Sequence, residues 1–260
     1  MPTFTTPGPI AATVAVAGAQ VQVTASDRTD TVVLVEPINK ASQSDVKVAS
    51  KTSVDFAGGQ LTVKTTVPGG KNGSVAISID LPAGSSLAAH LAHSSVQANG
   101  PLGDCELQLA SSQVQLDRIS ALQADIAAGE VTVGHIAGRA SIQGGTAAVR
   151  ISEVNGTVTL MSAAGQTWID RADGSVTAKT GDGAIRIGRL TRGQAELANS
   201  SGNIEIGIGE GTAARVDASS TKGSVRNSLP PQENPGAAGH QVTVHARTRH
   251  GDIIIQRAAS

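Results

Sequence analysis

The residues of this chain whose side chains could bind a partner directly recur at one interval. Arg150, Trp168 and Arg186 follow one another eighteen residues apart, and Glu205 and Arg226 continue the series at nearly the same spacing. An arginine over an indole face gains about 0.5 to 1 kcal/mol at an exposed site. Trp and Arg are also enriched at interaction hot spots. We therefore take these five residues as a candidate binding site, for a partner protein or an acidic sugar.

The same series has a simpler interpretation. Side chains that face each other across neighbouring strands stabilise a sheet by about 0.2 to 1 kcal/mol for each pair. The five residues would then support one face of a sheet and shield Trp168. Both interpretations stay open at this point.

Residues suited to catalysis or metal binding are dispersed. Asp170, Asp173 and Asp182 form the nearest approach to an acidic cluster, beside Arg171 and several glycines. Glycosidic bond cleavage needs two carboxylates placed around the bond, and a structural zinc site needs closely spaced Cys or His ligands. No phosphate loop, nucleophile elbow or Cys/His pair occurs in the sequence. We expect no enzyme activity, no metal and no cofactor.

A period of about eighteen residues positions the candidate site, and it runs from near Leu87 almost to the C-terminus. Each period holds two apolar pairs that begin nine residues apart, and within a pair the apolar residues alternate, as Val131 and Val133 do. The first pairs begin at Leu87, Cys105, Leu122, Ala140, Val158, Val176, Ala195, Val216 and Val244, and the second at Val96, Val114, Val131, Val149, Thr167, Ile185, Ile204, Val225 and Ile253. The period predicts an all-β fold, a β-solenoid resembling a parallel β-helix with two strands per coil.

Two columns of glycines separate the strand positions. Gly129, Gly165, Gly183, Gly202, Gly223 and Gly251 precede the second pairs, and Gly138, Gly156, Gly174, Gly193 and Gly211 close the same coils. Glycine adopts positive φ at little cost, so these columns are expected to be the corners of the coils. An antiparallel meander in a sandwich or barrel stays an alternative, because its strands recur at a similar spacing.

The sequence also predicts a division into domains. Residues 10 to 82 contain strand patterns without the eighteen-residue register, so we expect a β-rich N-terminal region, 1–84, that caps the solenoid domain, 85–260. Residues 228–239 interrupt the repeat, and Pro230, Pro231 and Pro235 predict an exposed loop there.

The composition of the chain excludes some classes of function. The formal net charge of −1 disfavours nucleic-acid binding.

The N-terminus shows no secretory signal and no segment is long and apolar enough to span a membrane, so a cytoplasmic location is expected. The single Cys105 occupies an inward position and is expected to be a buried small hydrophobe.

The C-terminal strand suggests a second interaction site. Ile253, Ile254 and Ile255 are consecutive, so an alternating strand must direct one of them away from the core. An exposed apolar edge invites pairing. We expect either another part of the chain to cover this strand or self-association through it.

Four segments carry a family resemblance: "PIAATVAVAGAQVQVTASDRTDTVVLVEP", "SVAISIDLPAGSSL", "SSGNIEIGIGEG" and "ARTRHGDIIIQRA". The chain resembles the bacterial adhesin-like β-strand-repeat family, a domain of unknown function common in actinobacteria. The resemblance covers nearly the whole chain and implies the fold but no catalytic residues. Our main interpretation is a non-enzymatic scaffold or protein-binding solenoid. An adhesin-like carbohydrate or surface-binding module is the alternative, and a carbohydrate-active β-helix enzyme is the third possibility.

Overall fold

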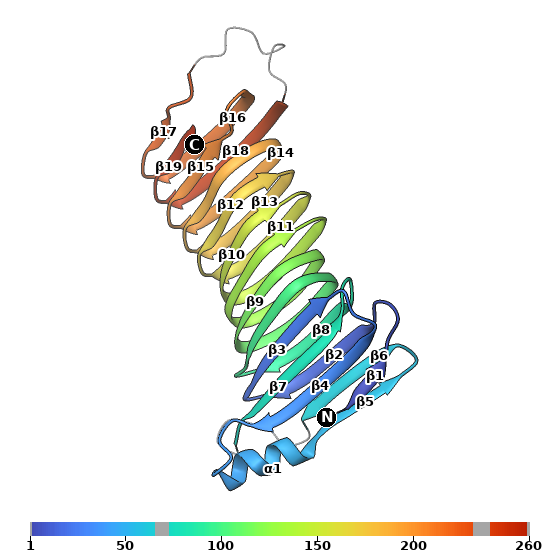
Figure 1. Ribbon diagram of the computed structural model, residues 1–260. Coiled ribbons are helices and arrows are strands. Elements are labelled where there is room, and N and C mark those ends of the chain that lie inside the picture. The colour runs from blue at the N-terminus through green and yellow to red at the C-terminus, as the bar shows by residue number, and fades with distance from the viewer. Residues whose placement is uncertain (1, 66–72, 231–239, 259–260) are drawn as a thin grey trace. The chain divides into compact units, whose positions relative to one another are not determined.

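The computed structural model describes residues 2–65, 73–230 and 240–258. Contacts between residues divide the chain into two compact units, Met1–Val131 and Thr132–Ser260. In both units parallel strands stack on one another (Figure 1). Their inward side chains are buried, and their outward side chains are mostly exposed or half-buried. The predicted all-β class and solenoid-like stacking are thereby confirmed.

The first unit is built around strands that are not stacked in chain order. It contains β2 (Ala11–Ala17), β3 (Ala19–Ser26), β6 (Gln60–Thr65), β7 (Val75–Pro82), β8 (Ser86–Ala92) and β9 (Ser95–Ile136, which continues past the boundary of the unit). β2 pairs in parallel with β6 on one side and β8 on the other, and β3 pairs likewise with β7 and β9. The coil of β2 and β3 therefore lies inside the stack, and the coil of β6 and β7 lies outside it.

Further elements cover this outer coil. β5 (Thr52–Ala57) pairs antiparallel with β6, β4 (Asp30–Pro37) pairs antiparallel with β7, and β1 (Thr3–Thr5) pairs with β4. Helix α1 (Gln43–Lys51) contacts β4, β6 and β7, and its Val48 is fully buried. The open end of the coil interior is thus closed by an apolar helix face.

The second unit shows the repeat directly. Its strands are β10 (Arg139–Val154), β11 (Thr157–Ala164), β12 (Thr167–Asp173), β13 (Ser175–Asp182), β14 (Ile185–Ser201), β15 (Ile204–Ile208), β16 (Thr212–Lys222), β17 (Val225–Asn227), β18 (His240–His250) and β19 (Ile253–Arg257). β11 stacks on β13 with Val158 opposite Val176, an offset of eighteen residues. One inward row consists of isoleucines, and it is fully buried: Ile151, Ile169, Ile187, Ile206 and Ile255. These parallel pairs exclude the antiparallel meander.

The last strands of the chain are not the last strands of the stack. β18 lies between β14 and β16, and β19 lies between β15 and β17. Ile253 and Ile255 are fully buried, and Ile254 is half-buried. Of the two outcomes expected for this strand, the structure shows cover by other parts of the chain, because β15 and β17 occupy both of its edges. Self-association through Ile253, Ile254 and Ile255 stays a prediction.

Three further sequence predictions concern the domain boundary, the proline-rich segment and the glycine columns. The division at residue 84 stays a prediction, although parallel stacking already includes β2, β3, β6 and β7. Of the proline-rich segment 228–239, residues 231–239 lie outside the described part. One glycine column is confirmed as corners, since each of its six members has a positive φ, from 116° at Gly202 to 154° at Gly223.

Candidate functional site

The structure brings the first four residues of the predicted series into one outward row. Arg150 lies opposite Trp168, Trp168 opposite Arg186, and Arg186 opposite Glu205. Arg226 does not follow Glu205 directly. Ile254 comes next and Arg226 after it, because β19 is inserted between β15 and β17. We call the row of Arg150, Trp168, Arg186 and Glu205 the tryptophan row.

Charged side chains hold the indole between them without covering it. The Cζ atom of Arg150 lies 5.6 Å from the ring centroid of Trp168, within the range of a cation–π contact. Arg150 Nη2 is 3.6 Å from Asp170 Oδ2, and Arg186 Nε is 3.6 Å from Glu205 Oε2. Trp168 remains 39% exposed. Part of this side chain is therefore accessible to a ligand.

A hollow of about 670 Å³ lies along the tryptophan row. Gly188 and Gly207, two positions beyond Arg186 and Glu205, form part of its lining. A Cβ atom at Gly188 would lie 2.6 Å from the carbonyl oxygen of Asp170, so a larger residue would force the neighbouring strands to shift. No sequence prediction included Gly188 and Gly207. Two glycines at the same outward position of successive repeats were the available indication.

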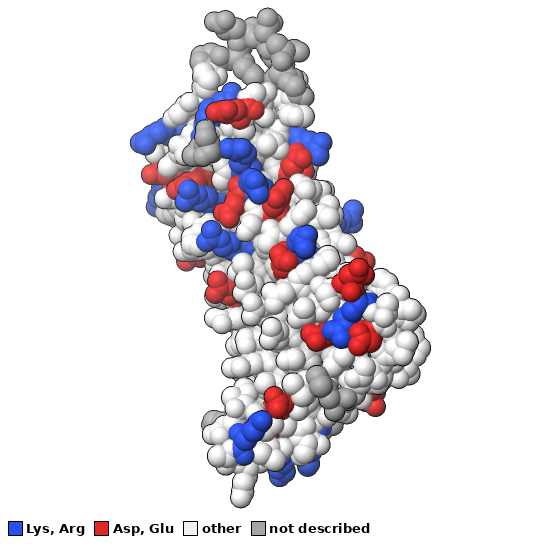
Figure 2. Space-filling model, in the orientation of Figure 1, with Lys and Arg blue, Asp and Glu red and all other residues white. Residues whose placement is uncertain are grey.

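Arginines outnumber carboxylates in the lining of the hollow. The lining includes Arg150, Arg171, Arg186 and Arg189 beside Asp170 and Glu205, and Arg171 also pairs with Glu153 at 3.0 Å. Figure 2 shows Lys and Arg side chains interleaved with Asp and Glu on the visible face of the strands β10 to β19. The hollow therefore differs from the surrounding surface in its concentration of guanidinium groups, whose planar forks suit a carboxylate or sulfate.

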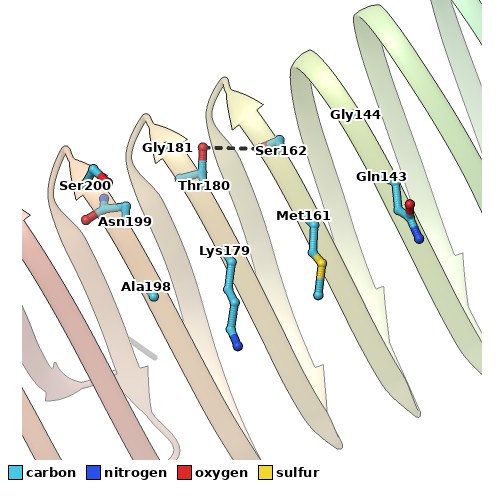
Figure 3. A pocket seen from close by; sticks show the side chains of 10 residues that line it. All are labelled: Gln143, Gly144, Met161, Ser162, Lys179, Thr180, Gly181, Ala198, Asn199 and Ser200. Carbon is cyan, nitrogen blue, oxygen red and sulfur yellow. Dashed lines mark hydrogen bonds between the residues drawn. The ribbon is translucent and has the colours of Figure 1, made fainter.

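A second hollow, of about 550 Å³, lies on other strands of the same unit (Figure 3). Ser162 Oγ donates a hydrogen bond of 3.1 Å to Thr180 Oγ1, and the Asn199 amide donates to the carbonyl oxygens of Gly183 and Gly202. Its one cation, Lys179, lies 2.6 Å from Glu196. The polar groups here hold the corners of successive coils together, so we assign this hollow a structural role.

Two other sequence predictions concern reactive groups. Cys105 is buried, and burial raises the pKa of its thiol to about 12, as expected for a core residue rather than a nucleophile. Within residues 2–65, 73–230 and 240–258, no three His, Cys, Asp or Glu side chains are grouped closely enough to hold a metal ion.

Comparison with known proteins now identifies the family. The family model described as Toastrack DUF4097 matches residues 12–256, almost the whole chain. The chain belongs to the Toastrack DUF4097 family. No curated protein matches this Toastrack chain. The described residues contain one helix, the nine-residue α1, and it is too short to cross a membrane.

Solved structures similar to this Toastrack chain are named as candidate adhesins. One from Parabacteroides merdae is 12% identical, with 98% of this chain and 94% of that chain covered and a TM-score of 0.39. One from Bacteroides fragilis is 11% identical, with coverage of 98% and 95% and a TM-score of 0.41. One from Parabacteroides distasonis is 12% identical, with coverage of 98% and 95% and a TM-score of 0.43. At these values their names say nothing of what this chain binds, and an actinobacterial source stays a prediction.

Proposed function

We propose that this chain is a non-enzymatic surface-binding module and that the hollow along the tryptophan row recognises an acidic carbohydrate. The observation that carries this proposal is the exposed indole of Trp168 with an arginine in register on either side. The C–H face of a pyranose packs against an aromatic ring. A carboxylate or sulfate on the sugar is suited to the planar fork of an arginine.

The size and charge of the hollow favour this ligand class. Small-molecule sites measure about 300 to 1,000 Å³, and this hollow lies within that range. Arg150 and Arg186 lie on either side of Trp168 and each is only 3.6 Å from its carboxylate, so an anionic group on the sugar has guanidinium groups within reach beside the ring. The scaffold function that was our main interpretation of the sequence has less support, because the predicted residues line a hollow of ligand size rather than a flat face.

The carboxylates argue for binding rather than catalysis. Asp170 and Glu205 each lie 3.6 Å from an arginine nitrogen. A glycosidase needs one carboxylic acid that is protonated and a second carboxylate across the bond. Because both carboxylates of the hollow already lie against arginines of the row, we assign them to positioning the guanidinium groups rather than to catalysis.

The proposal implies that this protein is located where acidic glycans occur. An adhesin-like protein of this kind would be exposed at a cell surface, whereas the sequence led us to expect a cytoplasmic location. Immunodetection in fractionated cells decides between the two locations, independently of the binding test.

The binding test compares oligosaccharides of matched length with and without uronate or sulfate groups. We expect the protein to bind the acidic members, Trp168→Ala to weaken binding by at least about 30-fold, equivalent to 2 kcal/mol, and Arg186→Ala to weaken it by about tenfold. Met161→Ala is the matched control, since Met161 is a large, 47% exposed side chain of the second hollow. Equal binding of neutral and acidic glycans, or unchanged binding by Trp168→Ala, would refute the proposal.

A further inference from the structure

Strand β16 pairs along one edge, and no strand of the described residues pairs along the other. Its eleven residues, Thr212–Lys222, pair with β18 on one side. Within the described residues, no strand is registered against its other side. The neighbouring β17 is likewise registered only with β19. An open edge of this length presents unpaired N–H and C=O groups to another strand.

The open edge also exposes apolar interior. Ala214, Val216 and Ala218 point along the inward row, since Val216 lies opposite the fully buried Val244, yet all three are only half-buried. Arg215 and Asp217 form the exposed outward row between them. A strand that covers this edge therefore has to offer small apolar residues on one face and complementary charges on the other.

A second copy of β16 meets both requirements in one register. When two copies run antiparallel around a two-fold axis at Val216, Arg215 of each copy lies opposite Asp217 of the other, and Ala214 lies opposite Ala218. If the axis is moved by one residue, either the two Arg215 side chains or the two Asp217 side chains of the dimer face each other. Like charges directly opposite destabilise a sheet. We propose that β16 pairs antiparallel with β16 of a second copy of this chain, with Val216 at the two-fold axis.

Each of the two charged groups keeps atoms that can make these contacts. Asp217 Oδ2 already lies 2.6 Å from Arg247 Nη2 and 3.5 Å from His245 Nδ1. Its second oxygen, Oδ1, has no partner in the described part of the chain, and neither has the guanidinium of Arg215. Each interface therefore gains two ion pairs that the single chain does not make. This surface is separate from the tryptophan row, so failure of one proposal leaves the other intact.

Cysteine cross-linking tests the register in the full-length protein. Residues that face each other across an antiparallel pair have Cα atoms about 4.5 to 5.5 Å apart, which suits a disulfide. Under mild oxidation we expect Val216→Cys to form a covalent dimer. Ser219→Cys is the control on the same strand, because the two copies of residue 219 would lie about 20 Å apart. The native Cys105 is buried and does not interfere.

Sedimentation and light scattering test the interface without a cross-link. We expect a particle of twice the 26.0 kDa chain mass, a dimer weakened at least about tenfold by Arg215→Glu, and a dimer retained by Arg215→Lys. Arg139→Glu, at an exposed arginine on β10, and Ile254→Lys on β19 should leave the mass unchanged. A monomer at every soluble concentration would overturn the proposal. Equal cross-linking of Val216→Cys and Ser219→Cys, or loss of the dimer in Ile254→Lys, would also overturn it.

Discussion

The end coils of the two units have the same topology and different covers. In the first unit β6 and β7 lie outside β2 and β3, and in the second β16 and β17 lie outside β18 and β19. In each case the strands nearer the chain terminus are held between two neighbours, which protects them from fraying. The outer coil of the first unit is then closed by β4, β5 and α1, whereas no described element closes the outer coil of the second.

The difference shows what a cover does for a parallel stack. β7 is buried at every second residue or more, while β16 is at most half-buried from Ala214 onward and β17 is exposed throughout. The stacking pattern alone therefore does not bury an end coil. A helix with one apolar residue over the interior does so in the first unit, and a second copy of the chain would do so in the second.

The largest loss of stability is expected for a substitution in the interior of a middle coil. Ile187 is 1% exposed and lies between Ile169 and Ile206. Replacement by Asp buries a carboxylate without a partner, so we expect Ile187→Asp to lose more than about 4 kcal/mol and to unfold the second unit. Circular dichroism and limited proteolysis report the loss. Thr159→Asp, on an outward row of β11, should change stability by only about 0.5 kcal/mol. A soluble, cooperatively folded Ile187→Asp would contradict the register.

Equivalent substitutions at the two ends test the comparison itself. Val48→Asp places a charge where α1 covers the coil, and Val216→Asp places one at the open end. We expect the first to cost about 3 kcal/mol or more and the second about 1 kcal/mol, because water reaches Val216. Hydrogen exchange localises each effect to its unit, at a concentration low enough to keep the chain monomeric. Equal losses at the two ends would show that the C-terminal coil is covered after all.

A titratable group fastens the N-terminal cover. The two carboxylate oxygens of Asp45 accept hydrogen bonds of 3.0 Å from the backbone N–H groups of Ser74 and Asn39. These bonds, that of Ser74 first, lower the pKa of Asp45. A lowered pKa in the folded state means that the stabilisation is present above the unfolded pKa of about 3.9 and is lost as the pH falls through the folded value.

We therefore expect Asp45→Asn to loosen α1 at neutral pH and to abolish this acid sensitivity. Protease cleavage within α1, followed as a function of pH, measures both effects. The control is Asp55→Asn in the same unit, since Asp55 is exposed on β5. If α1 of the native chain is released no sooner in acid than that of Asp45→Asn, the carboxylate does not fasten the cover.

The same contrast explains what the sequence predicted and what it missed. The isoleucine row around Ile187 and the tryptophan row as far as Glu205 follow from local spacing, because each strand stacks on the one a period earlier. Between β3 and β6 the chain leaves the stack to build the cover, so the period is lost there. The local sequence does not decide whether β17 or β19 pairs with β15, because both strands have a pattern that could stack on it. Asn227, a polar residue opposite the buried Ile255, is the indication that β17 is the outer strand.

A small effect is also expected for Trp168, on the outward face of a middle coil. Trp168 is 39% exposed and packs mainly with Arg150, so Trp168→Ala should cost only about 1 kcal/mol, most of it the cation–π contact and partial burial. Because Trp168 is the only tryptophan, unfolding has to be followed by circular dichroism rather than by indole fluorescence. If Trp168→Ala no longer folds, the indole must point inward, and the true register differs by one residue from that of the structure. A variant that folds normally but no longer binds acidic glycans would separate the two roles of this row, since the inward isoleucines would then support the stack while the exposed indole serves the ligand.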